Sequence, residues 1–331
     1  MSEKEHTLTS ITFDKDGKEQ KIEVKDIDWA FTRENALYLV TNNDRVYTFE
    51  IKEENQTKIF DALHKANPQI ILGAYAGERI GFSSLPNTRD LGGMQAKDGR
   101  FIRPRRLLRS AALHKVNKAD KKRLENEFNV RLILDLRTDM ERLSAPDPVI
   151  LQAVHVHVPA RNASTLDLLS KEVDAKHMVD LLKKADKTMK YLYEDLVVSE
   201  QGLKAYRQFF QLILDQEEGS VLWHCTQGKD RTGIGAMLLL SALGISKDAI
   251  YKDYLRTNEY LEAEKDNLKL RLKNHPEWIK DLDALYDAKK EYLDIAYRSI
   301  EDNFGSMDNY LREGLGLDQK MINTLQERYL V

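Results

Sequence analysis

Short hydrophobic runs alternate with polar turns over the first eighty residues. β-Branched and aromatic residues gather at 7–13, 21–24, 36–40 and 45–51, and the sequences DKDGK and TNNDR between them are typical of turns. The segment 57–66 then has apolar residues at helical spacing. This pattern predicts a small antiparallel β unit with one helix. Because it gathers no nucleophile or phosphate loop, we expect an accessory role.

The pattern changes to alternating strands and helices from about residue 80. Val130–Leu136 and Gly219–Cys225 are nearly continuous apolar runs, which is typical of strands buried on both faces. Helical spacing precedes the first run at 117–128, and Gly233–Gly244 has the composition of a buried helix ended by glycine. Strand, loop and helix in this order predict an α/β fold with a central sheet.

Helical patterns fill the rest of this region. Residues 163–200 predict two helices, one more than a crossover between parallel strands needs. The tail 247–331 is also helical. We therefore expect a β-rich unit at 1–78 and a larger α/β domain at 79–331, with a helical insertion at about 163–200.

Composition and charge exclude several classes of protein. The 331 residues carry 51 Lys and Arg against 54 Asp and Glu, a net charge of −3, whereas nucleic-acid binders usually show a basic excess. No apolar run approaches the roughly 20 residues that span a bilayer, and the N-terminal MSEKEHTLTS lacks the apolar segment of a secretory signal. We expect a cytoplasmic protein with no nucleic-acid partner and at most peripheral membrane contact.

The single cysteine, Cys225, rules out an intramolecular disulfide and a cysteine-rich zinc site. The eight histidines are scattered, and His155 and His157, two apart on an apparent strand, have no third ligand candidate beside them in the sequence. We therefore expect neither a metal nor another cofactor. The thiol is either an inert core group or a chemical one.

Cys225 lies in the stretch VLWHCTQGKDRTG, which runs from a buried strand into the start of a buried helix. Backbone N–H groups and the helix dipole at such a turn form a cradle for anions. Gly228 lets the backbone approach an anion closely, and Arg231 can hold two phosphate oxygens in a bidentate fork. Because the field at the base of the cradle favours a thiolate, the loop predicts nucleophilic phosphoryl transfer by Cys225.

The alternative for this stretch is an inert cysteine beside a helix cap. A cysteine followed six residues later by an arginine often arises by chance. However, three charged residues in a row, Lys229 to Arg231, make little sense for packing alone inside a strand–helix loop. The whole string therefore favours phosphate chemistry.

The loop HCTQGKDRTG resembles the signature loop of the cysteine-dependent protein tyrosine phosphatase superfamily, and especially that of bacterial tyrosine/serine and phosphoinositide phosphatases. Four other stretches resemble motifs of the same subfamily: Asn87–Gly93 (NTRDLGG), Leu108–Ser110 (LRS), Asp135–Glu141 (DLRTDME) and Asp253–Asn258 (DYLRTN). Thr257 stands where the subfamily has serine. The resemblance runs from about residue 80 to the C-terminus. It implies a tyrosine phosphatase-like, mostly parallel central sheet flanked by helices.

The resemblance implies a role for each residue of the loop. Cys225 would be the nucleophile, Arg231 the phosphate clamp and Thr232 the hydroxyl that eases departure of the thiolate. His224 would brace the loop and tune the thiolate, or it is simply a hydrogen-bonded histidine at a strand end. The remaining loop residues would bind the substrate phosphate: Thr226, Gln227, Gly228 and Lys229. Three residues of the other motifs would support the loop: Arg89, Arg109 and Asp135.

The general acid has two candidates. Many tyrosine phosphatases supply this acid as the aspartate of a separate WPD loop, but the sequence contains no WPD string. The subfamily carries an aspartate within the signature loop, here Asp230, which lies beside Arg231 and can protonate a leaving oxygen. Asp135 is the alternative, because it ends a strand where the active-site groups of α/β sheets gather. Its other role would be to pair with an arginine. We favour Asp230 as the acid.

Lys229 bears on the substrate class. A lysine here resembles the lipid phosphatases of the tensin-homologue type, and an aspartate at 230 resembles myotubularin and Sac-type phosphoinositide phosphatases. The lysine would meet a second anionic group on an inositol ring, or it is a solvated charge that raises the local potential.

Two further segments have a functional and a structural interpretation. Residues 163–200 would be the helical lid found in part of this subfamily, which excludes water and protects the thiolate, or they are helices packed on the sheet. A basic cluster is the second segment, and it would bind anionic substrate or membrane phosphate, or it is a salt-bridged face. The cluster consists of Arg100, Arg103, Arg105, Arg106 and Arg109.

We therefore expect a bacterial, cytoplasmic hydrolase that cleaves phosphate monoesters through a phosphocysteine intermediate. Its expected partners are its substrates, phosphotyrosine proteins or phosphoinositides, with phosphoserine and phosphothreonine as further candidates. A pseudophosphatase that binds phosphate without turnover is the first alternative, but the intact Cys225, Asp230, Arg231 and Thr232 argue against it. A rhodanese-type sulfurtransferase, which also uses a cysteine loop, is the second alternative. Arg231, Thr232 and Gly233 at the start of a helix fit phosphate binding better than sulfur transfer.

Overall fold

The computed structural model describes residues 8–15, 18–162, 184–271, 273–274, 279 and 283–331. The chain divides into two compact units, Met1–Tyr75 and Ala76–Leu330. Each unit has a hydrophobic core of its own.

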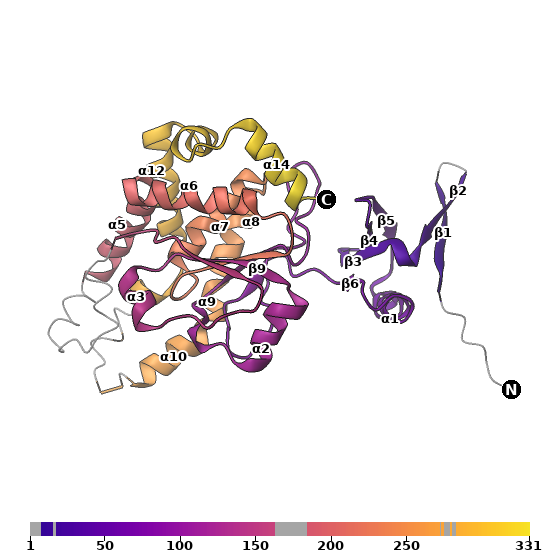
Figure 1. Cartoon of the computed structure of the whole chain (residues 1–331), viewed down its shortest axis with the longest axis horizontal. Coiled ribbons are helices and arrows are strands. Elements are labelled where there is room, and N and C mark those ends of the chain that lie inside the picture. The colour runs from indigo at the N-terminus through magenta and orange to yellow at the C-terminus, as the bar shows by residue number, and fades with distance from the viewer. Residues whose placement is uncertain (1–7, 16–17, 163–183, 272, 275–278, 280–282) are drawn as a thin grey trace. The chain divides into compact units, whose positions relative to one another are not determined.

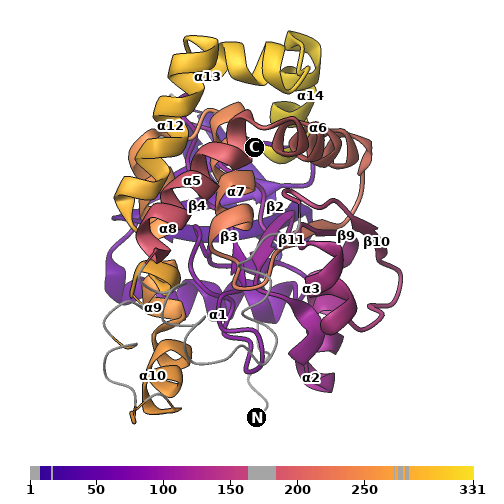
Figure 2. The ribbon, with the colours of Figure 1, turned by 90° about the vertical axis from the view of Figure 1, so that its left-hand side faces the viewer.

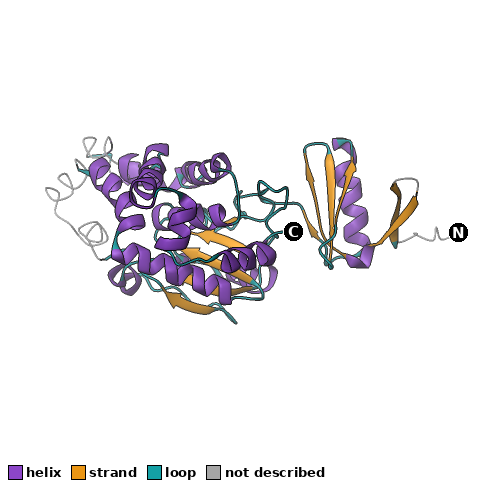
Figure 3. Cartoon of the chain, turned by 90° about the horizontal axis from the view of Figure 1, so that it is seen from above, coloured by secondary structure: helices purple, strands orange, loops and turns teal. Residues whose placement is uncertain are grey.

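The first unit contains two small sheets and one helix (Figure 3), where the sequence pattern predicted one antiparallel β unit and a helix; one pair, β3–β6, is parallel. β1 (Ser10–Lys15) pairs with β2 (Lys18–Glu23), and the second sheet has the order β5-β4-β3-β6. Its elements are β3 (Ile27–Arg33), β4 (Ala36–Thr41), β5 (Val46–Glu50), β6 (Ile71–Leu72) and the helix α1 (Gln56–Ala66). β3 is missing from the prediction because the buried residues Trp29, Ala30 and Phe31 break the alternation of a half-buried strand and are too few for a continuous apolar run.

The second unit is built on a five-stranded sheet of order β10-β9-β11-β8-β7. Its strands are β7 (Arg89–Asp90), β8 (Leu107–Ser110), β9 (Val130–Asp135), β10 (Val154–His157) and β11 (Ser220–His224). The pairs β10–β9, β9–β11 and β11–β8 are parallel, and only β7 runs antiparallel to its neighbour. Every residue of the central strand β11 is buried, which explains its continuous apolar sequence. The expected mostly parallel α/β sheet is confirmed.

Helices cover both faces of this sheet, with α6 and α7 on one side and α2 and α3 on the other (Figures 1 and 2). The helices before β11 are α2 (Lys118–Lys122), which continues as a π-helical turn (Arg123–Glu127), α3 (Asp139–Ser144), α5 (Ala185–Val198) and α6 (Glu200–Asp215). Those after it are α7 (Asp230–Ala242), α8 (Lys247–Leu255), α9 (Thr257–Tyr260), α10 (Glu262–Arg271), α12 (Lys290–Phe304), α13 (Met307–Asn309) and α14 (Gln319–Tyr329). Helix α7 is buried on all sides because it packs between the sheet and its neighbouring helices.

The predicted insertion at 163–200 lies partly outside the described residues, which resume at 184. Its second half forms α5, and α6 follows directly, with Ser199 capping α6 by accepting from the N–H of Gly202. α5 packs against α7 and α12 and buries Met189 and Tyr193. In the part of the chain that the structure describes, no helix is long and apolar enough to cross a membrane.

Candidate active site

The loop between β11 and α7 places Cys225 at the carboxyl edge of the parallel sheet. β11 lies between β9 and β8, and the three strands run in one direction, so their carboxyl ends meet at the edge where α/β folds bind ligands. Helix α7 begins at Asp230 and not at Gly233, where the sequence pattern placed its start. The charged residues Asp230 and Arg231 therefore belong to the first turn of a buried helix, and Cys225 is only 2% exposed.

Gly228 allows the loop to pass close to the end of β8. Its φ of +71° lies in the left-handed region that favours glycine. A Cβ atom here would lie 2.5 Å from the carbonyl oxygen of Ser110 and 2.7 Å from the nitrogen of Ala111. The backbone conformation and the close approach both require glycine.

Side chains from outside the loop bind its backbone carbonyl groups. Asn87 Nδ2 donates to the oxygen of Gln227 at 2.8 Å, and Arg109 Nη2 donates to the oxygen of Gly228 at 2.9 Å. None of the backbone N–H groups of residues 226–230 donates to another described residue. The carbonyl groups are held by these donors and the α7 dipole lies behind the loop, so the unpaired N–H groups are available to an anion, which is the arrangement that a cradle needs.

Arg231 is held by a carboxylate that the sequence analysis did not single out. Its Nη1 and Nη2 atoms lie 2.5 and 2.8 Å from the two oxygens of Glu141, and Thr226 Oγ1 donates to Glu141 at 2.5 Å. Burial would raise the pKa of Glu141, but the hydrogen bonds and charge of Arg231 outweigh burial and keep that pKa well below its usual range. Glu141 also closes the capping box of α3 with Thr138, so the helix itself fixes the carboxylate.

Three of the motifs noted in the sequence meet at Asp253. Its carboxylate pairs with Arg89 at 3.1 Å and with Arg109, and Arg89 Nη2 also donates to Thr257 Oγ1 at 2.8 Å. All four side chains are buried, so removing the Asp253 carboxylate would leave the charges of Arg89 and Arg109 uncompensated in the interior. Thr257 supplies a hydroxyl here, as the serine of the related motif would.

The two candidate acids have different surroundings. Asp230 keeps 17% of its side chain exposed, and Tyr193 donates to its Oδ1 at 2.6 Å. Asp135 accepts from Arg137 on both oxygens, at 2.8 and 2.7 Å. Burial would raise the pKa of Asp135, but the Arg137 hydrogen bonds and the charges of His224 and Arg137 lower it below its usual value. Asp135 is thus a paired carboxylate, and these surroundings favour Asp230 as the candidate acid.

A charged network lies directly behind Cys225. The ring of His224 is fully buried, with Nδ1 3.1 Å from the Cys225 oxygen and Nε2 3.0 Å from Asp147 Oδ2. Ligand atoms of Asp135, Asp147 and His224 lie within 4.8 Å of one another, a spacing that suits a metal ion. However, Arg137 Nη2 already donates to both carboxylates at 2.7 Å. The cluster is therefore an ion-paired support that fixes His224 beneath the loop.

Comparison with known proteins agrees with this geometry. Residues 80–331 match the sequence model of the tyrosine phosphatase family. A Cupriavidus necator protein that carries the name of a tyrosine-protein phosphatase is 31% identical over 261 residues, which cover 77% of this chain and 91% of that protein. The chain belongs to the tyrosine phosphatase family. It is accordingly a phosphatase.

Other relatives of this phosphatase match shorter parts of it. The triple specificity protein phosphatase PtpB of Mycobacterium tuberculosis is 32% identical across 32% of this chain and 42% of its own length. A tyrosine-protein phosphatase of Nostoc commune is 34% identical across 47% of this chain and 50% of its own. The crystal structure of Pseudomonas aeruginosa TpbA covers 47% of this chain and 71% of its own at 18% identity and a TM-score of 0.25, which is too low to carry an argument.

Lys229 of this phosphatase is buried, whereas the sequence analysis expected it to face the substrate or the solvent. Its side chain is fully buried, so the idea of a solvated charge is wrong. Its Nζ atom donates to the carbonyl oxygen of Leu285 and, at 3.5 Å, to that of Asp287. Lys229 therefore ties the loop to the segment before α12, and in this conformation its ammonium group is already partnered.

The basic cluster at 100–109 also makes structural contacts. Arg100 pairs with Asp98 at 2.7 Å, and Arg106 donates to the carbonyl oxygen of Glu217. Arg109 is the buried exception that braces the loop. The salt-bridged interpretation accounts for these contacts.

Four residues of the site were missed as functional candidates. Two of them, Asn87 and Glu141, lie inside motifs that the sequence showed, and a closer interpretation of these motifs would have found them. Tyr193 and Asp147 have no such signal, because only the packing of α5 and of the segment after α3 brings them to the loop.

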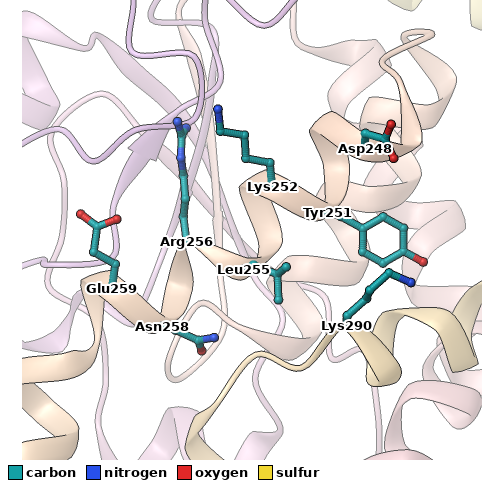
Figure 4. Close-up of a pocket in the computed structure, with 8 residues that line it drawn as sticks. All are labelled: Asp248, Tyr251, Lys252, Leu255, Arg256, Asn258, Glu259 and Lys290. Atoms are coloured by element: carbon teal, nitrogen blue, oxygen red, sulfur yellow. The ribbon is translucent and has the colours of Figure 1, made fainter.

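The outer face of α8 and α9 carries a separate open pocket of about 670 Å³ (Figure 4). Its charged residues have mixed signs, with Lys252, Arg256 and Lys290 beside Asp248 and Glu259. The mixture gives the pocket no clear preference for an anion or a cation. The inner face of the same helices supports the loop through Asp253 and Thr257.

Proposed function

We propose that this phosphatase hydrolyses phosphotyrosine in proteins through a phosphocysteine intermediate. One observation carries the proposal: the carbonyl groups of Gln227 and Gly228 are held by Asn87 and Arg109, while the loop N–H groups around Cys225 have no described partner. Such a loop stabilises the three equatorial oxygens of a phosphoryl group in transfer. The names of the Cupriavidus necator and Nostoc commune relatives, both tyrosine-protein phosphatases, support phosphotyrosine as the substrate.

In the first step, the Cys225 thiolate attacks phosphorus, the P–S bond forms and the bond to the tyrosine oxygen breaks. Asp230 gives its proton to that oxygen, so tyrosine leaves as a neutral phenol. Arg231, oriented by the carboxylate of Glu141, holds two phosphoryl oxygens in a fork.

In the second step, water attacks the phosphocysteine, Asp230 takes up the proton of the water, and the thiolate leaves with the P–S bond electrons. Thr232 supports this departure in our proposal. Its Oγ1 is buried and has no hydrogen-bond partner among the described residues, so it is available to donate to sulfur. Inorganic phosphate is then released.

Phosphoinositides are a second substrate class that the loop sequence suggested. That expectation came from Lys229 and Asp230 together, and the ammonium group of Lys229 is bound to the 285–287 segment. We therefore place phosphotyrosine first, and substitution of Lys229 by methionine separates the two substrate classes.

The test is phosphate release from a phosphotyrosine peptide by the full chain, with Cys225→Ser as the matched variant. We expect the variant to lose more than about a thousandfold in kcat/KM while it still binds phosphate, and the wild-type chain to show a phosphorylated cysteine after acid quenching. A chain that binds vanadate but releases no phosphate would be a pseudophosphatase. A chain that does neither, and transfers sulfur to cyanide, would be a sulfurtransferase.

A further inference from the structure

Two buried tyrosines meet beside the proposed acid. Tyr193 of α5 and Tyr254 of α8 are almost completely buried, and their hydroxyl oxygens lie 2.6 Å apart. The Tyr193 oxygen also lies 2.6 Å from Oδ1 of Asp230. The loop motif and its resemblance assign no role to either tyrosine.

The number of available protons determines which hydroxyl donates in each of these two hydrogen bonds. A phenol carries one proton, and the proton of Tyr193 points to the carboxylate oxygen of Asp230, so the contact between the two tyrosines requires Tyr254 to donate to Tyr193. Burial, and then the charge of Asp230, raise the pKa of both phenols well above the usual value. Both remain neutral donors at physiological pH.

This arrangement makes the two oxygens of Asp230 unequal. Oδ1 accepts from Tyr193 and lies 3.5 Å from Lys229 Nζ. Oδ2 makes no hydrogen bond or ion pair with the residues that the structure describes. Because Asp230 retains some exposure at the start of α7, Oδ2 is the oxygen left to carry a proton to the substrate.

We infer that Tyr193 is a positioning residue that fixes the carboxyl group of Asp230 so that Oδ2 gives and takes the proton in catalysis, with Tyr254 orienting the Tyr193 hydroxyl. The inference rests on the proposed function and names a part of its acid–base step. Tyr193 acts through Asp230 and does not touch the reacting atoms. Titratable groups with a charge interaction with Asp230 lie on five helices and at the loop residue before α7: Tyr193, Tyr206, Arg231, Tyr254, Tyr292 and Lys229.

Tyr193→Phe isolates the hydroxyl, because the ring contacts do not depend on it. The Tyr193 ring packs 6.1 Å from the Tyr254 ring and 5.4 Å from the Tyr292 ring. Tyr292→Phe is the matched control. The Tyr292 hydroxyl belongs to the same cluster but donates to Asp186 at 2.9 Å and not to Asp230.

The experiment measures kcat/KM of the full chain on aryl phosphates whose leaving phenols span a range of pKa. Only poor leaving groups need a proton from Asp230. Tyr193→Phe should stay within about twofold on p-nitrophenyl phosphate and lose about tenfold on phenyl phosphate. Tyr254→Phe should change the leaving-group dependence in the same direction by a smaller factor, and Tyr292→Phe should leave it as in the wild type.

The double variant Tyr193→Phe/Asp230→Ala should match Asp230→Ala alone, because the hydroxyl then has no carboxyl group to position. An unchanged leaving-group dependence in a folded Tyr193→Phe variant, or a loss equal on all substrates, would overturn the inference while the proposed function stands. If Tyr193→Phe does not fold, Tyr254→Phe with a wild-type dependence overturns it. If the wild-type chain hydrolyses none of the aryl phosphates, the proposed function fails and the inference falls with it.

Discussion

Lys229→Met tests whether the loop lysine holds the fold or contacts the substrate. Methionine keeps an unbranched apolar stem in the buried site but removes the ammonium group. In the structure, that group donates to the carbonyl oxygens of Leu285 and Asp287 and lies 3.5 Å from Asp230. The substitution therefore unties the loop from the segment before α12 and leaves two carbonyl groups without their donor.

The magnitude follows from these contacts. A hydrogen bond from a charged group contributes about 1.5–3 kcal/mol net, and the second contact, at 3.5 Å, is long and weak. We expect a loss of about 2–4 kcal/mol in the free energy of unfolding. At about 2–4 °C per kcal/mol for a domain of roughly this size, Tm falls by roughly 4–16 °C.

Lys265→Met is the control for this substitution. Lys265 pairs with Asp283 at 2.7 Å and Asp287 at 2.6 Å, so it binds the same segment from a more exposed position. Its removal should lower the free energy of unfolding by about 1 kcal/mol or less. Scanning calorimetry measures Tm for the two full-length variants. It thereby compares a buried and a more exposed lysine that both bind the segment before α12.

Activity separates the structural role of Lys229 from a substrate contact. If it ties the loop, kcat/KM on a phosphotyrosine peptide and on a phosphoinositide should fall together, with their ratio within about twofold of wild type. A variant that melts as the wild type does and loses about tenfold or more only on the lipid would refute our reasoning. It would show that Lys229 leaves its carbonyl partners to bind the second phosphate.

Two further predictions concern the loop itself. Glu141→Gln should weaken vanadate binding by about tenfold or more, because Arg231 then loses the negative charge that holds both of its terminal nitrogens. Unchanged affinity in a vanadate titration would mean that Arg231 needs no carboxylate for its orientation. Gly228→Ala should abolish measurable vanadate binding, since its Cβ would lie 2.5 Å from the Ser110 oxygen. Gly244→Ala has a similar φ of +75° but no atom within 4 Å of the added Cβ, so it should keep its affinity; equal losses in both variants would mean that strain alone matters.

The sequence by itself determined the elements whose signal is local. The apolar runs at 130–136 and 219–225 predicted β9 and β11, because a strand buried on both faces must be apolar throughout. The loop around Cys225 was equally visible, since an anion cradle needs a glycine, a helix start and an arginine close together in the chain. Strand β3 of the first unit was not visible, because its three consecutive buried residues break the alternation of a half-buried strand and are too few for a continuous apolar run.

Tertiary structure decided which residues act on that loop. The carboxylate that orients Arg231 comes from α3, ninety positions earlier, and the hydroxyl that reaches Asp230 comes from α5. It also decided that Lys229 is buried and partnered, whereas its charge alone suggested a residue facing solvent or substrate. A side chain's type shows what it can bind, but its partner depends on which elements the sheet and its helices bring together, and no local pattern records that packing.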